Sequence, residues 1–213
     1  MNEEYGTYLV TQEDLAEGRS TVEIVEAAIA GGVDVVQLRK KHATARRRYD
    51  LGWKLRRRTA AAGVDLIVND RVDIAAAVDA DGVHLGDDDL PVSVARELLE
   101  DAVVGRSVST VETARRAESN GADYLGVGAV FATSSKDVSE EESGIGTETV
   151  SAIADAVSVP VIGIGGITVD DAADVVAAGA TGVAVISAIT AADDPERATR
   201  TLAAAVASGR DRR

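Results

Sequence analysis

The segment Gly121–Asp137 reads GADYLGVGAVFATSSKD and contains the elements from which the rest of the sequence is built. A turn leads into the short apolar run Tyr124–Gly128, which has the pattern of a buried strand. Glycines stand here where a packed strand prefers Val or Ile, so we expect another group to approach the backbone closely. The hydroxyls and the ammonium group of Thr133–Lys136 then suit an anion. The polar stretch Val138–Gly146 predicts a binding loop or lid, with a solvated connection as the alternative.

The same unit of strand and helix recurs along the whole chain. We predict further strands at Thr7–Val10, Val33–Leu38, Asp65–Val68, Gly82–Leu85, Ala102–Ser107, Pro160–Ile164 and Gly182–Ile186. We predict helices from Ser20 to Gly31, then at Arg46–Ala62, Val72–Ala80, Pro91 to about Glu100, Thr110–Ser119, Thr147–Ala156, Asp170–Ala178 and Pro195–Ala207. Alternation of this kind predicts one (β/α)8 TIM barrel over residues 1–213, and a doubly wound open sheet is the competing fold.

The composition describes a globular and strongly acidic chain. Of its 213 residues 46% are apolar, none is cysteine, and the net charge is −14. The charge argues against nucleic acid as a partner, and the lack of a membrane-length apolar run or a basic leader predicts a soluble, cytoplasmic protein. Many carboxylates with few lysines and aromatics indicate adaptation to a salt-rich cytoplasm, although an ordinary acidic protein is the alternative. The sequence leaves the oligomeric state open, and a homo-oligomer is one of the alternatives.

Cationic side chains follow the predicted second strand. Gln37, Arg39 and Lys41 alternate, so an extended chain directs them to one side, and Lys40 lies between them. A guanidinium fork, an ammonium and an amide together suit a diphosphate. The run Arg46–Arg48 is different, because three consecutive helical residues cannot all face one ligand; we expect a solvated helix start there. In the same helix we expect Tyr49, Trp53 and Leu55 to face partly inward.

Carboxylates follow the next two predicted strands. Asn69 and Asp70 end the third strand, and Asp89 lies in the loop after the fourth. Two hard oxygen ligands near a diphosphate are a suitable site for Mg²⁺, with water and phosphate oxygens completing the octahedron. Asp87 and Asp88 fit equally well as ordinary loop residues. His84 lies inside the fourth strand, where a hydrogen-bonded core histidine is the more ordinary interpretation than a catalytic one.

The last two predicted strands end in small residues. Gly165 and Gly166 follow the seventh strand, and Ile186 and Ser187 end the eighth. In a (β/α)8 barrel these are the positions at which a phosphate is commonly bound, by backbone N–H groups and a helix start.

Together these segments resemble the thiamine-phosphate synthase family. The resemblance rests on QLRKK (37–41), ND (69–70), GVHLGDDDLP (82–91), GRS (105–107), GADYLGVGAVFATSSK (121–136), PVIGIGGIT (160–168) and GVAVISAI (182–189). It implies a (β/α)8 barrel that couples 4-amino-2-methyl-5-pyrimidinylmethyl diphosphate to 4-methyl-5-(2-phosphoethyl)thiazole. Diphosphate leaves and thiamine phosphate forms, with Mg²⁺ as the cofactor.

The resemblance also implies roles for individual residues. Contacts with the pyrimidine diphosphate fall on Gln37, Arg39, Lys41, Asn69 and Lys136, with Arg39, Lys41 and Lys136 as the catalytic cations. The Mg²⁺ ligands fall on Asp70 and Asp89, and Ser107 meets the pyrimidine ring. The thiazole-phosphate site falls on Thr133, Ser135, Gly165, Ile186 and Ser187. Lys40 and Ser134, which adjoin these groups, complete the predicted substrate-binding set.

Some residues depart from the family pattern. Asp87 stands where the family usually has Gln, Ala129 where it has Pro, and Ser135 where it has Thr. Ser135 keeps the hydroxyl, whereas Asp87 adds a negative charge near a diphosphate and has no explanation in the sequence. Two other functions compete: a thiazole tautomerase on the same barrel, and a catalytically silent phosphate-binding regulator. The presence of Lys41, Asp70, Asp89 and Lys136 argues against both.

Overall fold

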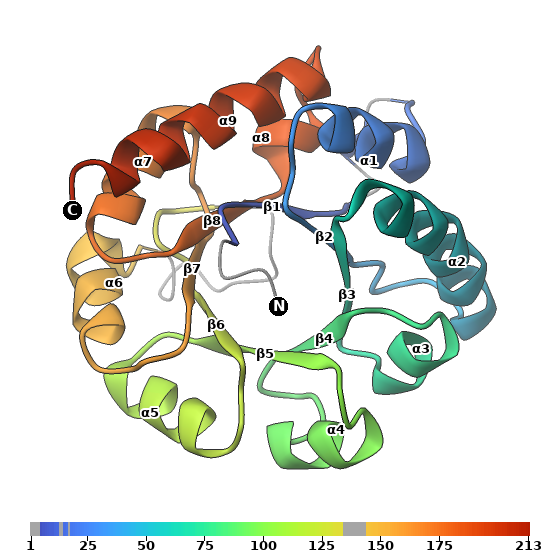
Figure 1. The fold of residues 1–213 in the computed structure, drawn as a ribbon, viewed down its shortest axis with the longest axis horizontal. Helices are drawn as coiled ribbons and strands as arrows, with labels where there is room; N and C mark the ends of the chain where they lie inside the picture. The colour runs from blue at the N-terminus through green and yellow to red at the C-terminus, as the bar shows by residue number, and fades with distance from the viewer. Residues whose placement is uncertain (1–4, 13–14, 17, 134–143) are drawn as a thin grey trace.

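The computed structural model describes residues 5–12, 15–16, 18–133 and 144–213, and it shows a closed barrel of parallel strands inside a ring of helices (Figure 1). Each strand pairs with the next along the chain, and the last strand returns to pair with the first. The strands are β1 (Thr7–Val10), β2 (Val35–Leu38), β3 (Asp65–Asn69), β4 (Gly82–Leu85), β5 (Val103–Val108), β6 (Tyr124–Val127), β7 (Val161–Ile164) and β8 (Gly182–Val185). The TIM barrel is confirmed, and the open sheet is excluded.

The helices lie on the outside of the barrel, where each of the first seven connects two successive strands and the last two follow the final strand (Figure 1). They are α1 (Thr21–Ala30), α2 (Ala45–Ala62), α3 (Val72–Ala77), α4 (Val92–Leu98), α5 (Val111–Ser119), α6 (Gly146–Ala154), α7 (Val169–Ala177), α8 (Ser187–Thr190) and α9 (Pro195–Arg210). Only α8 has no counterpart among the predicted helices, because four residues are too few to show a period. Within the described ranges no helix is both long enough and apolar enough to span a membrane.

Local sequence fixes where the helices begin and end. At α1 the Ser20 hydroxyl accepts a hydrogen bond from Glu23 N, and the Glu23 carboxylate accepts one from Ser20 N at 2.7 Å. This is the predicted capping box, and Gly31 ends the helix as predicted. Strands β1 and β4 have the predicted bounds, and the other elements differ from prediction by up to a few residues at one or both ends; β2, for example, starts at Val35 and not at Val33.

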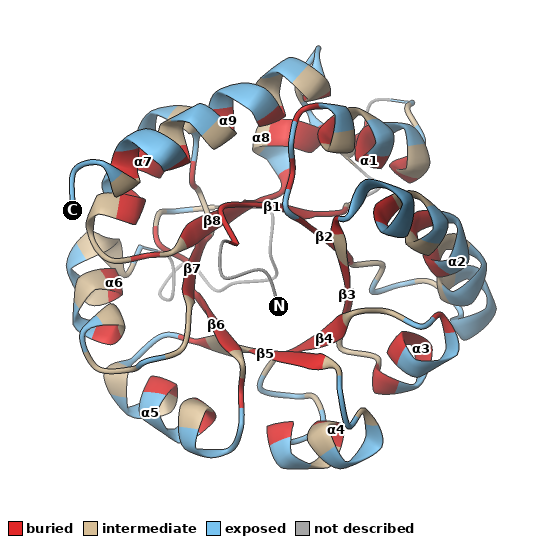
Figure 2. Cartoon of the chain, viewed as in Figure 1, coloured by how far each residue is buried: buried red, intermediate tan, exposed pale blue. Residues whose placement is uncertain are grey.

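The strands separate two apolar cores. Alternate strand residues point outward and pack beneath the helices, while the remainder fill the barrel interior. Figure 2 shows that the strands are buried along most of their length. The inner core includes Tyr5, Tyr8, Val35, Ile67, Val103, Tyr124 and Ile162. Two of its largest members, Tyr8 and Tyr124, carry hydroxyl groups, so the interior of the barrel needs hydrogen-bond partners as well as apolar contacts.

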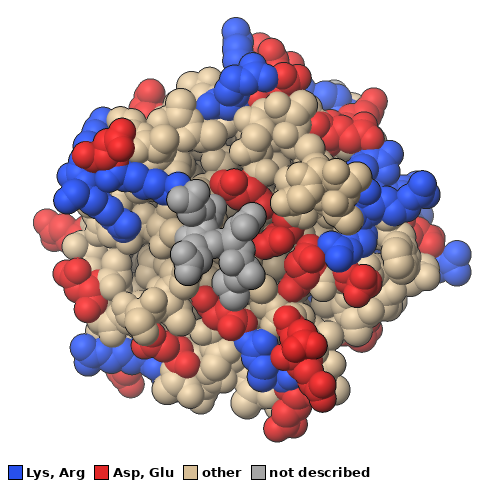
Figure 3. Space-filling view, viewed as in Figure 1, with Lys and Arg blue, Asp and Glu red and all other residues tan. Residues whose placement is uncertain are grey.

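Helix α2 is more exposed than its sequence suggested. Leu55 is fully buried, whereas Tyr49 and Trp53, which we predicted to face partly inward, are 36% and 38% exposed. The two rings pack edge to face on each other instead, with centroids 6.5 Å apart. Basic side chains gather over α2 at the right of the face in Figure 3, and a second group lies at its left, while acidic side chains are widely spread over the same face.

Candidate active site

The carboxyl ends of the strands surround a cavity of about 180 Å³. It gathers predicted site residues that come from separate strands and loops: Gln37, Arg39, Lys41, Asn69, Asp70 and Ser107. Tyr8, His84 and Tyr124 line the same cavity from the barrel interior. The cations and one of the predicted metal ligands therefore face a common space.

A second cavity, of about 380 Å³, adjoins the first at the ends of β7 and β8. Thr133, Gly165, Ile186 and Ser187 all line it, which brings together the predicted thiazole-phosphate residues that the structure describes. Ile164 and Ala184 line both cavities. The two cavities therefore share part of their apolar lining.

The loop after β2 is held by bonds to its backbone. The Arg39 N–H donates to the Thr11 hydroxyl at 3.0 Å, and Arg48 at the start of α2 donates to the carbonyl oxygens of Lys40 (2.9 Å) and Lys41 (2.6 Å). These bonds fix the backbone from which Arg39 and Lys41 extend into the cavity. The side chain of Lys40 lines neither cavity, and burial followed by the charge of Arg47 lowers the pKa of its ammonium group.

Asp70 and Asp89 form a pair of neighbouring carboxyl groups. Asp70 has a left-handed backbone (φ 66°), and its N–H donates to the His84 carbonyl at 2.8 Å. Burial, and then the adjacent Asp89, raises the pKa of Asp70 to about 6. Asp89 is fixed in turn, because its carboxylate accepts from Gly86 N at 2.6 Å. A pair of this kind gains most from a cation placed between its oxygens.

The donor set of this pair fits Mg²⁺ better than a softer metal. In the part of the chain that the structure describes, no group of three or more His, Cys, Asp or Glu side chains is arranged to hold a metal ion. Among the described residues, Asp70 and Asp89 offer two neighbouring carboxylates, and Mg²⁺ is commonly bound in this way, with water and substrate phosphate as its other ligands.

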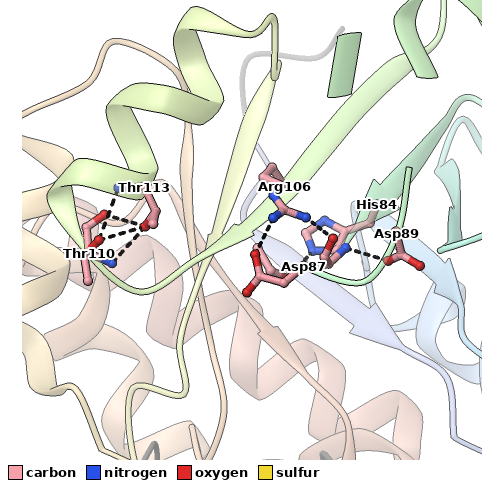
Figure 4. Close-up of polar contacts among 8 residues, drawn as sticks. His84, Asp87, Asp89, Arg106, Thr110 and Thr113 are labelled. Carbon is pink, nitrogen blue, oxygen red and sulfur yellow. Dashed lines mark hydrogen bonds and ion pairs between the residues drawn. The ribbon is translucent and has the colours of Figure 1, made fainter. Parts of the chain in front are cut away.

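The structure explains Asp87. Its carboxylate forms an ion pair with Arg106 of β5, and Arg106 also donates to the Gly86 carbonyl (Figure 4). Asp87 and Arg106 thereby fasten the loop whose next residues carry Asp89. Because Asp87 pairs with Arg106, its negative charge repels a bound diphosphate less than the sequence suggested.

A connected set of hydrogen bonds crosses the barrel interior; we call it the barrel network. The Gln37 amide nitrogen lies 2.8 Å from the Tyr8 hydroxyl, which lies 2.9 Å from the Tyr124 hydroxyl. His84 joins Tyr124 at Nδ1 and the Ser107 hydroxyl at Nε2, each at 2.9 Å. Burial raises the pKa of both phenols well above the ordinary value, so they remain protonated. His84 is thus a hydrogen-bonded core histidine, as the ordinary interpretation predicted.

Glycines make room for this network. A Cβ at Gly105 would lie 2.2 Å from the Tyr124 ring, and one at Gly126 would lie 2.9 Å from the His84 ring. The group that the sequence predicted to approach the strand Tyr124–Gly128 is therefore, at Gly126, the imidazole of His84.

Glycine also shapes the second cavity. Gly165 and Gly166 have φ of 100° and 66°, a region that favours glycine. A Cβ at Gly165 would lie 2.7 Å from Ala129 Cβ, and one at Gly166 would lie 2.6 Å from the Ala132 carbonyl oxygen. The turn after β7 therefore approaches the segment after β6 more closely than any side chain allows. The peptide bond between Gly128 and Ala129, where the family usually has Pro, is cis.

Part of the predicted site lies outside the described residues. Ser134, Ser135 and Lys136 fall there, together with most of the predicted binding loop. The roles of these three residues stay predictions.

Comparison with known proteins identifies the family. The sequence model of a family described as thiamine monophosphate synthase matches residues 7–189. The chain belongs to the thiamine-phosphate synthase family. A thiamine-phosphate synthase of Haloquadratum walsbyi is 66% identical over 97% of this chain and 93% of its own length, and one of Natronomonas pharaonis is 65% identical over 97% of both. The solved thiamine phosphate pyrophosphorylase of Pyrococcus furiosus superposes with a TM-score of 0.90 at 40% identity, over 98% of each chain.

Family membership makes the protein an enzyme, a transferase of thiamine biosynthesis. Its halophile relatives agree with the salt-adapted composition. Sequence reasoning missed the residues that support the site without being charged ligands of it: Thr11, Arg48, Arg106, Tyr8 and Tyr124. The glycines inside β5 and β6 were the one sign that large side chains fill the barrel at this level.

Proposed function

We propose that this barrel joins 4-amino-2-methyl-5-pyrimidinylmethyl diphosphate to 4-methyl-5-(2-phosphoethyl)thiazole and releases diphosphate and thiamine phosphate. The observation that carries the proposal is the meeting of Arg39, Lys41 and Asp70 in one cavity, with Asp89 beside Asp70. Two cations and a carboxylate pair suit a diphosphate that brings Mg²⁺ with it. A site for a single phosphate needs no such pair.

The two adjoining cavities support a separate position for each substrate. We assign the pyrimidine diphosphate to the first cavity, with its diphosphate beside Arg39 and Lys41, and the thiazole phosphate to the second, beside Gly165 and Ser187. Their shared wall at Ile164 and Ala184 lets the reacting methylene and ring nitrogen meet. One barrel domain, residues 1–213, would hold both substrates, and we place the reaction in the cytoplasm.

Asp70 and Asp89 would hold Mg²⁺, which neutralises charge on the diphosphate when it is bound. The reaction breaks the bond between the pyrimidine methylene and a diphosphate oxygen, and the electron pair leaves with that oxygen. The lone pair of the thiazole nitrogen forms the new C–N bond, and no proton has to move. The side chains therefore bind, orient and stabilise charge, with Arg39 and Lys41 facing the leaving group. Lys136 is the predicted third cation.

The test is to incubate the purified protein with both substrates and Mg²⁺ and to detect thiamine phosphate by mass. Thiamine phosphate should form only in the complete mixture, and chelation of the metal should stop it. A thiazole tautomerase or a silent phosphate-binding protein would give none, and that result would overturn the proposal.

A further inference from the structure

The barrel network has a direction, because each of its members has a limited supply of protons. A phenol has one proton to donate, and a neutral imidazole donates from one nitrogen and accepts at the other. Tyr8, Tyr124 and His84 are linked in series between Gln37 and Ser107. The choice of donor at one end therefore decides the donor at every later bond.

In the structure the donor at the first bond is the Gln37 amide nitrogen, 2.8 Å from the Tyr8 hydroxyl. Tyr8 then donates to Tyr124, and Tyr124 donates to His84 Nδ1. The imidazole proton is left on Nε2 and points to the Ser107 hydroxyl oxygen, 2.9 Å away. The proton of Ser107 itself is free to turn toward the cavity.

A charged His84 would break this order. Both ring nitrogens would then donate, so the Tyr124 oxygen would accept from Tyr8 and from His84 together. The Tyr124 proton would have no acceptor within a buried site, and burying an unpaired donor is costly. A neutral imidazole with its proton on Nε2 satisfies every internal bond.

The two ends of the barrel network line the same cavity. With Gln37 donating inward through nitrogen, its amide oxygen is the acceptor left for a ligand, while Ser107 offers an O–H donor. The cavity thus presents one acceptor and one donor whose identities are linked through Tyr8, Tyr124 and His84.

We propose that the barrel network is a polarised relay that makes Ser107 a hydrogen-bond donor and the Gln37 amide oxygen an acceptor toward the ligand. The ligand class that it selects is an amino-substituted nitrogen heterocycle, whose exocyclic amine donates and whose ring nitrogen accepts. Tyr8, Tyr124 and His84 are positioning residues of this selection. The choice of ligand rests on the function proposed above, whereas the direction of the relay does not.

The direction can be measured without substrate. The chain has only two histidines, His84 and the exposed His42, so ¹⁵N-labelled histidine gives two separable sets of signals. The NMR shifts should assign the neutral Nε2–H tautomer to His84. An Nδ1–H tautomer or a doubly protonated ring would overturn the proposal.

Gln37→Glu should reverse the relay. At alkaline pH the new carboxylate only accepts, so Tyr8 must donate to it, Tyr124 to Tyr8, and His84 Nδ1–H to Tyr124. The tautomer of His84 should therefore switch to Nδ1–H. Adding Tyr8→Phe should abolish the switch, because the substitution removes the link.

Tyr5→Phe is the matched control. Tyr5 is buried in the same inner core and packs edge-on against Tyr124, but its hydroxyl bonds to Asp65 and lies outside the relay. In the Gln37→Glu background it should leave the switch intact. If Gln37→Glu leaves the His84 tautomer unchanged, or if Tyr5→Phe and Tyr8→Phe act alike, the relay is wrong.

Activity gives an independent readout. Tyr124→Phe should raise the KM for the pyrimidine diphosphate about tenfold, the size expected for one lost hydrogen bond in a buried site, and leave the KM for the thiazole phosphate unchanged. Tyr5→Phe should change neither, and an equal rise in both constants would indicate a purely structural role and overturn the proposal. A protein that makes no thiamine phosphate would disprove the proposed function, while the tautomer measurements would still test the relay.

Discussion

The two adjoining cavities differ in whether side chains or backbone atoms form the functional part of their lining. The first is made of side chains: Arg39, Lys41, Asp70 and Ser107 face it, and its charged groups depend on the loops after β2, β3 and β4. In the second cavity, the turn through Gly165 and Gly166 forms part of the lining with backbone atoms alone, because neither residue has a side chain. In the proposed function, a metal-bound leaving group and a phosphate that only has to be held would thus lie on different halves of one barrel mouth.

This difference decides how each half can fail. A site made of charged side chains loses its chemistry when one of them is shortened. A site made of backbone loses little when a nearby side chain is shortened, and it fails when atoms are added where glycine is required.

The largest effect should come from the carboxylate pair. Asp89→Ala should lower kcat at least about 100-fold at limiting Mg²⁺, because metal sites usually lose this much or more when a supporting group is removed. Excess Mg²⁺ should restore part of the rate. The measurement is a Mg²⁺ titration of kcat for Asp89→Ala beside Asp88→Asn. Asp88 is the exposed neighbour, and its variant should behave like the native protein.

Asp70→Asn separates loss of metal from loss of fold. Asn tolerates the left-handed backbone of Asp70, and the substitution removes one charge from a crowded pair. In metal-free buffer Tm should rise by about 2–4 °C, as relief of roughly 1 kcal/mol would give once solvent screening of this half-exposed group is allowed for. A lower Tm with lost activity would mean that Asp70 supports the fold and does not await a cation.

The next largest effect on activity should come from the glycine turn that lines the second cavity. Gly166→Ala should raise the KM for the thiazole phosphate about tenfold, because the new Cβ would lie 2.6 Å from the Ala132 carbonyl and must displace the turn. Gly63→Ala is the matched control: Gly63 has a similar φ of 69° but open space around it. Both variants should lose stability on heating because of the left-handed backbone, Gly166→Ala more so because of the added clash, and only Gly166→Ala should alter KM. Equal KM values would show that the turn does not hold the substrate.

The fold could be predicted because each barrel strand is buried on both faces. Runs such as Thr7–Val10 and Gly182–Val185 stand out as apolar segments ended by glycine or polar residues, whatever lies beside them in space. The degree of exposure of Tyr49 and Trp53 could not be predicted, since hydrophobicity alone does not show that α2 buries only a narrow stripe through Gly52, Leu55 and Thr59.

The charged half of the site could be predicted better than its supports. Arg39, Asp70 and Ser107 end strands, and all strand ends of a parallel barrel meet at one face. Which inward residues meet inside the barrel depends on its closure: Tyr8 and Tyr124 are 116 positions apart and come together only because β1 and β6 face each other across it. Likewise, no spacing rule shows that Arg48, of three adjacent arginines, turns back to the loop before its helix.

A smaller effect on activity should come from Arg48, which holds the loop that carries the cations of the first cavity. Arg48→Ala should raise the KM for the pyrimidine diphosphate about fivefold, because the variant loses its bonds to the carbonyl oxygens of Lys40 and Lys41 and releases the loop that carries Arg39 and Lys41. Arg47→Ala is the comparison, since Arg47 lies in the same exposed turn and holds no part of this loop by a described bond. If the two variants give the same KM, the loop does not need Arg48.

The smallest effect should come from Ser187, a side chain at the edge of the backbone-built half. It is exposed at the start of α8 and lines the second cavity. Ser187→Ala removes one hydroxyl and adds nothing, so the KM for the thiazole phosphate should rise only about threefold, less than for Gly166→Ala, while the KM for the pyrimidine diphosphate stays constant. Steady-state kinetics with each substrate varied in turn measures both constants. A loss as large as that of Asp89→Ala would mean that this half, too, depends on a single side chain, and a larger rise for the pyrimidine diphosphate would mean that the two substrates occupy the opposite cavities.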